Sequence, residues 1–125
     1  EIRTITAQAV STMLGFELRH VGINCSDADA ALRHSTAVAE LLRIPLKQGN
    51  SSNFVGTGLE FLKTPGRGQH GHIAIGTNSI ERGVAYLERR GARMIPESRV
   101  EKDGRLTAVY MDMDVAGFAL HLVQL

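Results

Sequence analysis

Apolar residues at helical spacing occupy the start of the chain. They are Ile2, Ile5, Ala9 and Met13. This spacing predicts a helix over residues 2–14, and Gly15 is placed to end it. We interpret the apolar stripe as an interface, either onto the body of this domain or onto a neighbouring one.

A βαβββ pattern follows this helix. Alternating apolar residues predict a strand from Phe16 to Cys25, and Ser26 is placed to cap a helix that Pro45 ends. The apolar stripe expected on that helix consists of Ala31, Val38, Leu41 and Leu42. The elements expected after it are strands near 46–47, 54–55 and 59–63 and a linker at 64–69.

The same order of elements is expected again after the linker. A strand at 72–75 leads to a helix that Ser79 caps and Gly91 ends. The stretch around Pro96 is ambiguous from its pattern. The remaining expected elements are a turn at 102–104 and strands at 106–112 and 117–125.

The repeat is visible in the residues as well as in the order of elements. Its matching segments are His20-Val21-Gly22-Ile23 with His72-Ile73-Ala74-Ile75, and Glu60-Phe61-Leu62 with His121-Leu122-Val123. A unit of about fifty residues used twice predicts an α+β fold of two modules. We expect two βαβββ modules, about 17–64 and 70–125, in a pseudo-two-fold arrangement. They would form a curved mixed sheet with helices on its outer face, preceded by the N-terminal helix.

Alternation along the repeated strands assigns their residues to two faces. One face collects bulky apolar residues: Val21, Ile23, Cys25, Leu59, Phe61, Ile73, Ile75, Phe118, Leu120 and Leu122. The other face is small and polar, and it carries His20, Glu60, His72 and His121. A solvated sheet face would carry Lys, Glu, Thr and Arg instead, so this face indicates a concave surface that something occupies. The alternative is four unrelated polar side chains on a wet sheet.

Three imidazoles and one carboxylate suit a borderline divalent ion such as Zn, Ni, Co, Mn or Fe. Four protein ligands leave open positions only where the ion exceeds four-fold coordination, which favours an octahedral type of ion over structural zinc. Such an ion would act as a Lewis acid on a chelating oxygen or would activate bound water.

Composition excludes several classes of partner. The 125 residues carry 14 Lys and Arg against 13 Asp and Glu, so neither nucleic acid nor a membrane surface is indicated. A single cysteine, Cys25, allows no internal disulfide and no thiolate zinc cage. No apolar run approaches the roughly 20 residues that span a bilayer. We therefore expect a soluble, cytoplasmic protein.

Several longer segments resemble a known family. They are Gly15-Phe16-Glu17-Leu18-Arg19-His20-Val21-Gly22-Ile23-Asn24, Gly49-Asn50-Ser51-Ser52, Gly71-His72-Ile73-Ala74-Ile75-Gly76-Thr77-Asn78 and His121-Leu122-Val123. With the paired modules, they are similar to the vicinal oxygen chelate superfamily, which includes glyoxalase I and extradiol dioxygenases. They are most similar to a bacterial subgroup in which the domain follows a 4-hydroxy-2-oxoglutarate / 2-dehydro-3-deoxyphosphogluconate aldolase.

The resemblance implies a domain organisation and a set of partners. Residues 1–15 would be a final helix and junction from an upstream aldolase domain, and residues 16–125 the glyoxalase-like domain. A homodimer and a small-molecule ligand are also expected from the family. The aldolase chemistry itself would lie elsewhere, because Lys47, Lys63 and Lys102 stand in polar or loop contexts that do not suit a Schiff-base lysine.

The resemblance also places His20, Glu60, His72 and His121 where glyoxalase I-like members have their metal ligands. His121 departs from the pattern because those members carry Glu there, and this puts both isomerase and dioxygenase chemistry in doubt. The candidate catalytic residues are Glu60, His121 and Tyr110. An edge-strand tyrosine with a wet hydroxyl is the alternative interpretation of Tyr110.

Other chemistry-bearing side chains have structural interpretations. His70 is expected in a loop, His34 on a solvated helix face, and Cys25 as a buried inert thiol. Gly66-Arg67-Gly68 lacks the strand-to-helix context of a phosphate loop, so no organic cofactor-binding residues are assigned.

Two functions remain open from the sequence. The first is a metal-dependent enzyme domain of lyase or isomerase type that chelates a keto or hydroxy acid through two oxygens. The second is a non-catalytic module that binds a ligand or mediates oligomerisation for the aldolase. A drug-sequestering protein of the bleomycin-resistance kind would need a more aromatic cleft than this chain supplies.

Overall fold

We describe the protein from a computed structural model. The structure describes the backbone of residues 2–125 and the side chains from residue 7 onward. Glu1 and the side chains of Ile2 and Ile5 lie outside the described residues, and with them that part of the predicted N-terminal stripe.

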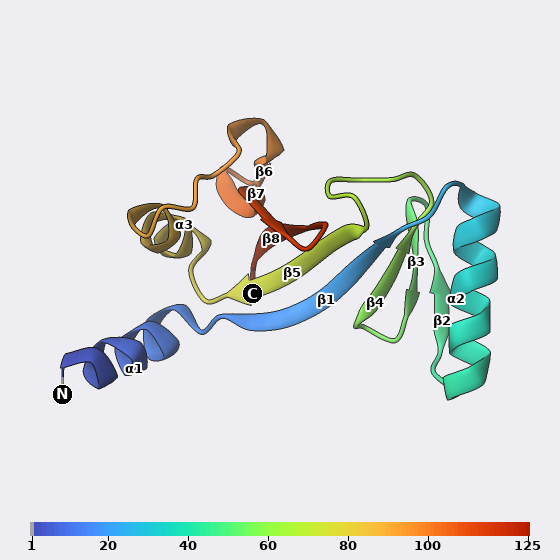
Figure 1. The fold of residues 1–125 in the computed structure, drawn as a ribbon, viewed down its shortest axis with the longest axis horizontal. Coiled ribbons are helices and arrows are strands. Elements are labelled where there is room, and N and C mark those ends of the chain that lie inside the picture. Colours follow the sequence, from blue (N-terminus) through green and yellow to red (C-terminus); the bar gives the residue numbers. More distant parts are fainter. Residues whose placement is uncertain (1) are drawn as a thin grey trace. The chain divides into compact units, whose positions relative to one another are not determined.

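The elements follow the predicted order of one helix and two βαβββ modules (Figure 1). The first helix is α1 (Ile2–Leu14). The first module comprises β1 (Glu17–Asn24), α2 (Ala28–Leu42), β2 (Leu46–Gln48), β3 (Ser52–Val55) and β4 (Leu59–Leu62). The second comprises β5 (Gly71–Thr77), α3 (Ile80–Arg89), a 3₁₀ turn (Pro96–Ser98), β6 (Val100–Lys102), β7 (Arg105–Val115) and β8 (Phe118–Gln124).

The strands form one eight-stranded mixed sheet in the order β2-β3-β4-β1-β5-β8-β7-β6. β1 pairs with β4 in parallel, and β3 pairs antiparallel with both β2 and β4. The α+β class, the two modules and the preceding helix are therefore confirmed. No helix in the described part of the chain is long and apolar enough to cross a membrane.

The predicted start of α2 is wrong by one residue. Asp27, not Ser26, is the N-cap, because its extended backbone lets the carboxylate accept a hydrogen bond from the Ala30 N–H at 2.7 Å. At α3 the prediction is confirmed: Ser79 accepts from the Arg82 N–H, and Gly91 follows the helix at a φ of 99°.

The chain divides into two compact units, which we name after a histidine in each. The His20 unit consists of Arg19–Ile73 and Asp114–Ala119. The His121 unit consists of Glu1–Leu18, Ala74–Met113 and Leu120–Leu125. The predicted boundary between residues 1–15 and 16–125 stays a prediction.

In the His20 unit, α2 packs along β2, β3 and β4 (Figure 1). The buried apolar residues there are Cys25, Ala30, Ala31, Ala39, Val55 and Phe61. The predicted helix stripe is wrong at Leu41 and Leu42, which are 82% and 55% exposed. The buried face of α2 follows Ala31, Ser35 and Ala39 at four-residue spacing, because small side chains let the helix lie close to the sheet.

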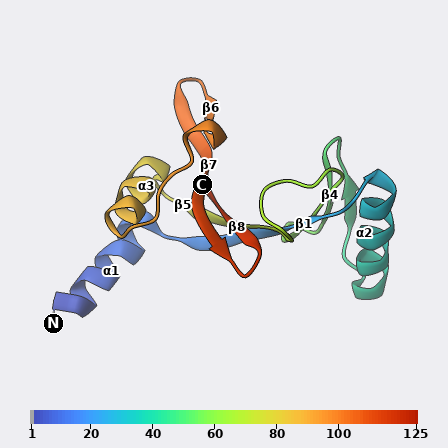
Figure 2. The ribbon, with the colours of Figure 1, turned by 45° about the horizontal axis from the view of Figure 1, so that its top comes forward.

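In the His121 unit, the buried apolar residues join α3 to the sheet. They are Ile80, Val84, Leu106, Val109, Met111 and Leu122. Figure 2 shows α1 beside α3, which it contacts. The bulky face predicted for β5 and β8 is confirmed at Ile75, Leu120 and Leu122, which belong to this cluster or pack against it.

Candidate metal centre

Three of the four predicted ligands converge in the His20 unit. The Nε2 atoms of His20 and His72 lie 3.1 Å apart. Glu60 Oε1 lies 3.3 Å from the first nitrogen and 3.2 Å from the second. Three side chains thus present one ligand atom each to a common point, and this group could hold a metal ion.

The register of the sheet explains why these side chains meet. Glu60 on β4 lies opposite Gly22 on β1, and His20 precedes that glycine by two residues on the same face. A Cβ atom on Gly22 would overlap the Cε1, Nδ1 and Nε2 atoms of the His72 imidazole. The missing side chain at Gly22 therefore makes the room that His72 occupies.

The spacing of the three atoms fits a metal ion. An ion bound at about 2.1 Å separates neighbouring ligand atoms by about 3.0 Å in octahedral and about 3.4 Å in tetrahedral geometry. The three separations, 3.1, 3.2 and 3.3 Å, lie between these values. Two imidazoles and one carboxylate are also a ligand set that first-row divalent ions accept.

The carboxylate of Glu60 is strongly held in its charged form. Hydrogen bonds from His20, from His72 and from the Ser52 hydroxyl keep the pKa of Glu60 well below its ordinary value, although partial burial opposes them. The Ser52 Oγ donates to Glu60 Oε2 at 2.7 Å. The side chain of His72 is 4% exposed, whereas those of His20 and Glu60 are 20% and 17% exposed. The group is therefore open to solvent from one side.

Ser52 and Phe54 line this site, and sequence reasoning missed both. Phe54 lies opposite Glu60 in the register, and its ring meets that of His20 edge-on at a centroid distance of 5.7 Å. The segment around Ser52 reads as a polar loop because Gly49, Asn50 and Ser51 precede it. The alternation of Ser52 with Phe54 was the available signal, since both then share a face with Glu60.

The fourth predicted ligand, His121, belongs to the other unit. Its imidazole stacks on the ring of Tyr110 at a centroid distance of 4.0 Å and an interplanar angle of 6°. Tyr110 is half-buried, and its backbone N–H donates to Ser98 Oγ at 2.8 Å. The structure thus brings two candidate catalytic residues together, and their relation to the group around Glu60 stays a prediction.

The remaining side chains singled out from the sequence lie outside the group around Glu60. His34 is exposed on α2, and His70 lies in the loop that precedes β5, as expected for each. Cys25 is 6% exposed, and burial raises the pKa of its thiol. A buried thiol with little thiolate is a poor nucleophile, in line with the interpretation of this residue as inert.

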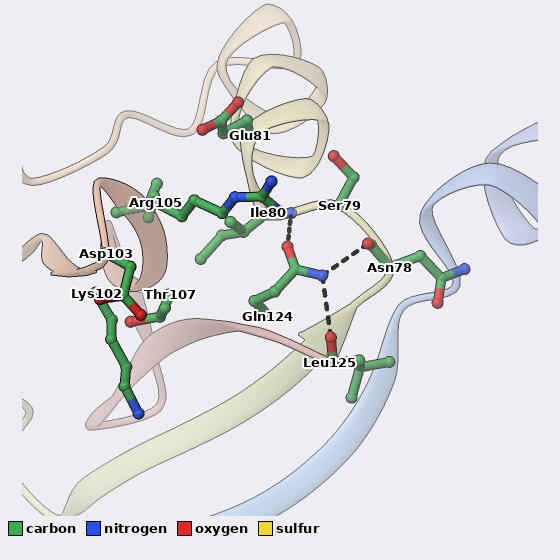
Figure 3. A pocket seen from close by; sticks show the side chains of 11 residues that line it. Asn78, Ser79, Ile80, Glu81, Lys102, Asp103, Arg105, Thr107, Gln124 and Leu125 are labelled. Carbon is green, nitrogen blue, oxygen red and sulfur yellow. Dashed lines mark hydrogen bonds between the residues drawn. The ribbon is translucent and has the colours of Figure 1, made fainter.

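A pocket of about 620 Å³ in the His121 unit lies beside the start of α3 (Figure 3). Gln124 reaches into it, accepting from the Ile80 N–H at 2.8 Å and donating to the Asn78 carbonyl at 2.7 Å. Side chains of both signs line the pocket, including Lys102 and Asp103. Because the chain's own side chain occupies the helix N-terminus, we assign this pocket a structural role.

Comparison with known proteins identifies solved structures that share this fold. No family model matches the sequence, and no curated protein matches it. A hypothetical protein, BH1468 from Bacillus halodurans C-125, is similar in structure with a TM-score of 0.59 and 20% identity, over 88% of this chain and 94% of that one. Methylmalonyl-CoA epimerase from Streptomyces coelicolor, in complex with 2-nitronate-propionyl-CoA, gives a TM-score of 0.57 and 18% identity, over 86% and 93%.

The epimerase from Mycobacterium tuberculosis gives a TM-score of 0.55 at 18% identity, over 86% of each chain. This chain has the fold of the vicinal oxygen chelate proteins. The fold implied by the sequence resemblance is therefore confirmed. The comparisons give no support for an upstream aldolase domain.

Proposed function

We propose that this chain is a metal-binding domain that presents a divalent ion to a small oxygenated ligand. The convergence of His20 Nε2, His72 Nε2 and Glu60 Oε1 carries the proposal. A bound ion would supply Lewis acidity to an oxygen of a chelating keto or hydroxy acid. The two histidines and the glutamate would hold the ion, and Phe54 would shield one side of the His20 ring from water.

The fold similarity to methylmalonyl-CoA epimerases suggests a second candidate ligand class, the thioesters of 1,3-dicarbonyl acids. Such compounds also offer two oxygens to one ion. Epimerisation needs acid–base groups beside the reacting carbon, and Glu60 is already engaged by two histidines and Ser52. Ligand binding without turnover, the accessory role, is the alternative within the same site.

Metal content tests the proposal directly. We expect about one transition-metal ion per chain by mass spectrometry after incubation with Ni, Co, Mn, Zn or Fe(II). His20→Ala, Glu60→Gln and His72→Ala should each lose the ion, because each removes one of three converging atoms. His34→Ala and His70→Ala are matched controls, since both histidines are exposed, and they should retain it. Wild-type protein that stays free of metal would overturn the proposal.

His121→Ala then decides how many side chains of this chain bind the ion. Loss of metal in this variant would support His121 as the fourth ligand. Retention of metal with altered ligand binding would instead support a role toward the small molecule, together with Tyr110. Adding oxalate, a 2-oxo acid or a malonyl thioester to Co(II)-loaded protein identifies the ligand class from the change in the visible spectrum.

The proposed assembly extends beyond this chain. We propose a homodimer that works beside an upstream aldolase domain, as the sequence resemblance implies, and a cytoplasmic location, as the composition indicates. Light scattering on the purified chain measures the oligomeric state, and a monomer at working concentrations would contradict the dimer.

A further inference from the structure

We propose that Ser52 determines how Glu60 meets the metal ion, by holding Oε2 so that Oε1 alone is offered as a ligand. This inference rests on the metal centre proposed above. Ser52 would be a positioning residue, because its hydroxyl donates to the carboxylate and is not one of the three converging ligand atoms.

The two oxygens of Glu60 have different partners. Oε2 accepts the Ser52 hydroxyl at 2.7 Å. Oε1 faces the two imidazole nitrogens at 3.3 and 3.2 Å. Rotation of the carboxylate to present both oxygens to one ion would draw Oε2 away from the Ser52 hydroxyl and weaken that hydrogen bond. Ser52 is 8% exposed, so water has little access to replace the lost contact.

The backbone around Ser52 is fixed on both sides, so the hydroxyl has little freedom to follow such a rotation. The Ser52 carbonyl accepts from the Gly49 N–H at 2.9 Å, and the Ser51 carbonyl accepts from the Lys63 N–H at 3.0 Å. A Cβ on Gly49 would lie 2.8 Å from the Ser52 carbonyl oxygen, so this turn needs glycine. The β3–β4 register aligns Ser52 with Leu62, one diagonal step from Glu60.

The coordination mode decides how much of the ion remains for a ligand. A bidentate carboxylate occupies two positions, whereas a carboxylate bound through one oxygen occupies one. With Oε2 held by Ser52, a six-coordinate ion keeps one more position for a chelating ligand. Partners that orient metal-ligating side chains in this way typically change affinity by about 10- to 100-fold when removed.

The test compares Ser52→Ala with Ser51→Ala, a matched control at the exposed neighbouring serine. Three quantities are measured: the Co(II) dissociation constant by chelator competition, the visible spectrum of the Co(II) protein, and the affinity of that protein for oxalate. We expect Ser52→Ala to weaken Co(II) binding about 10- to 100-fold, to change the spectrum and to weaken oxalate binding. Ser51→Ala and the hydroxyl-retaining Ser52→Thr should match the wild type.

Two further outcomes separate this inference from the proposed function. Wild-type protein that does not bind Co(II) overturns both. Normal Co(II) binding with a wild-type spectrum and oxalate affinity in Ser52→Ala overturns only the role of Ser52. If circular dichroism shows that Ser52→Ala does not fold, Ser52→Val replaces it, because valine has the shape of threonine without the hydroxyl and cannot bind Co(II). Ser52→Val should then show the same spectral change relative to Ser52→Thr, and a wild-type spectrum would overturn the inference.

Discussion

The two units hold the polar side chains of the repeat in different arrangements. In the His20 unit the small polar face carries three converging ligand atoms. In the His121 unit, His121 occupies the position that matches Glu60 in the repeat, and its ring stacks on that of Tyr110. The histidine that opens the second module, His72, lies on the part of β5 that belongs to the His20 unit. The two modules therefore contribute unequally to this group: the first supplies His20 and Glu60, and the second supplies His72.

One position in the repeat accounts for part of this difference. Gly22 and Ala74 occupy equivalent places, two residues after His20 and His72. The imidazole of His72 fills the space above Gly22, whereas Ala74 is itself fully buried. Glycine at position 22 thus leaves room for the His72 imidazole, whereas the methyl group of Ala74 fills the equivalent space in the second module.

The largest effect is expected from Gly22→Ala, which would make the first module resemble the second at this position. The added Cβ would displace His72, which is itself a proposed ligand, so we expect metal affinity to fall by at least about 100-fold, the upper end of the loss seen when only an orienting partner is removed. The measurement is Co(II) binding by chelator competition. Gly58→Ala is the matched control, because a Cβ there meets no atom within 4 Å, and it should bind normally. Metal binding by Gly22→Ala at wild-type affinity would contradict this explanation of the site.

A smaller effect is expected in the other unit from Gln124→Ala. The loss of the bonds to the Ile80 N–H and the Asn78 carbonyl should lower the free energy of unfolding by about 1 kcal/mol. Urea denaturation measures this change, and Gln48→Ala, at an exposed position on β2, provides the control. Metal content should stay unchanged, and a loss of metal would show that the pocket in Figure 3 influences the metal centre.

The smallest effect concerns a rate and not an equilibrium. Burial raises the pKa of the Cys25 thiol, so little thiolate forms at pH 8 and alkylation by iodoacetamide should be slow. We expect a rate at least about tenfold below that of the urea-unfolded chain, rising as the pH approaches the elevated pKa. Mass spectrometry follows the modification. Equal rates in folded and unfolded protein would show that the α2 side of the His20 unit opens readily.

Much of the fold follows from local signals. Period-two alternation placed His20, Glu60 and His72 on one face, and capping residues such as Ser79 marked a helix start. The buried face of α2 was predicted less well, because large leucines near its end suggested a stripe that alanines and a serine in fact supply. Apolar size alone does not show which helix face touches a sheet.

The sequence by itself determined the two modules and which residues of each strand share a face of the sheet. Both depend on spacing along a few consecutive residues. Only the tertiary structure decided which atoms of that polar face meet. The convergence depends on the β1–β4 register, on the space above Gly22 and on a hydroxyl contributed by Ser52 from a segment that reads as a loop. The first two join strands distant in sequence and the third crosses the β3–β4 hairpin, and no pattern along a single strand encodes these distances.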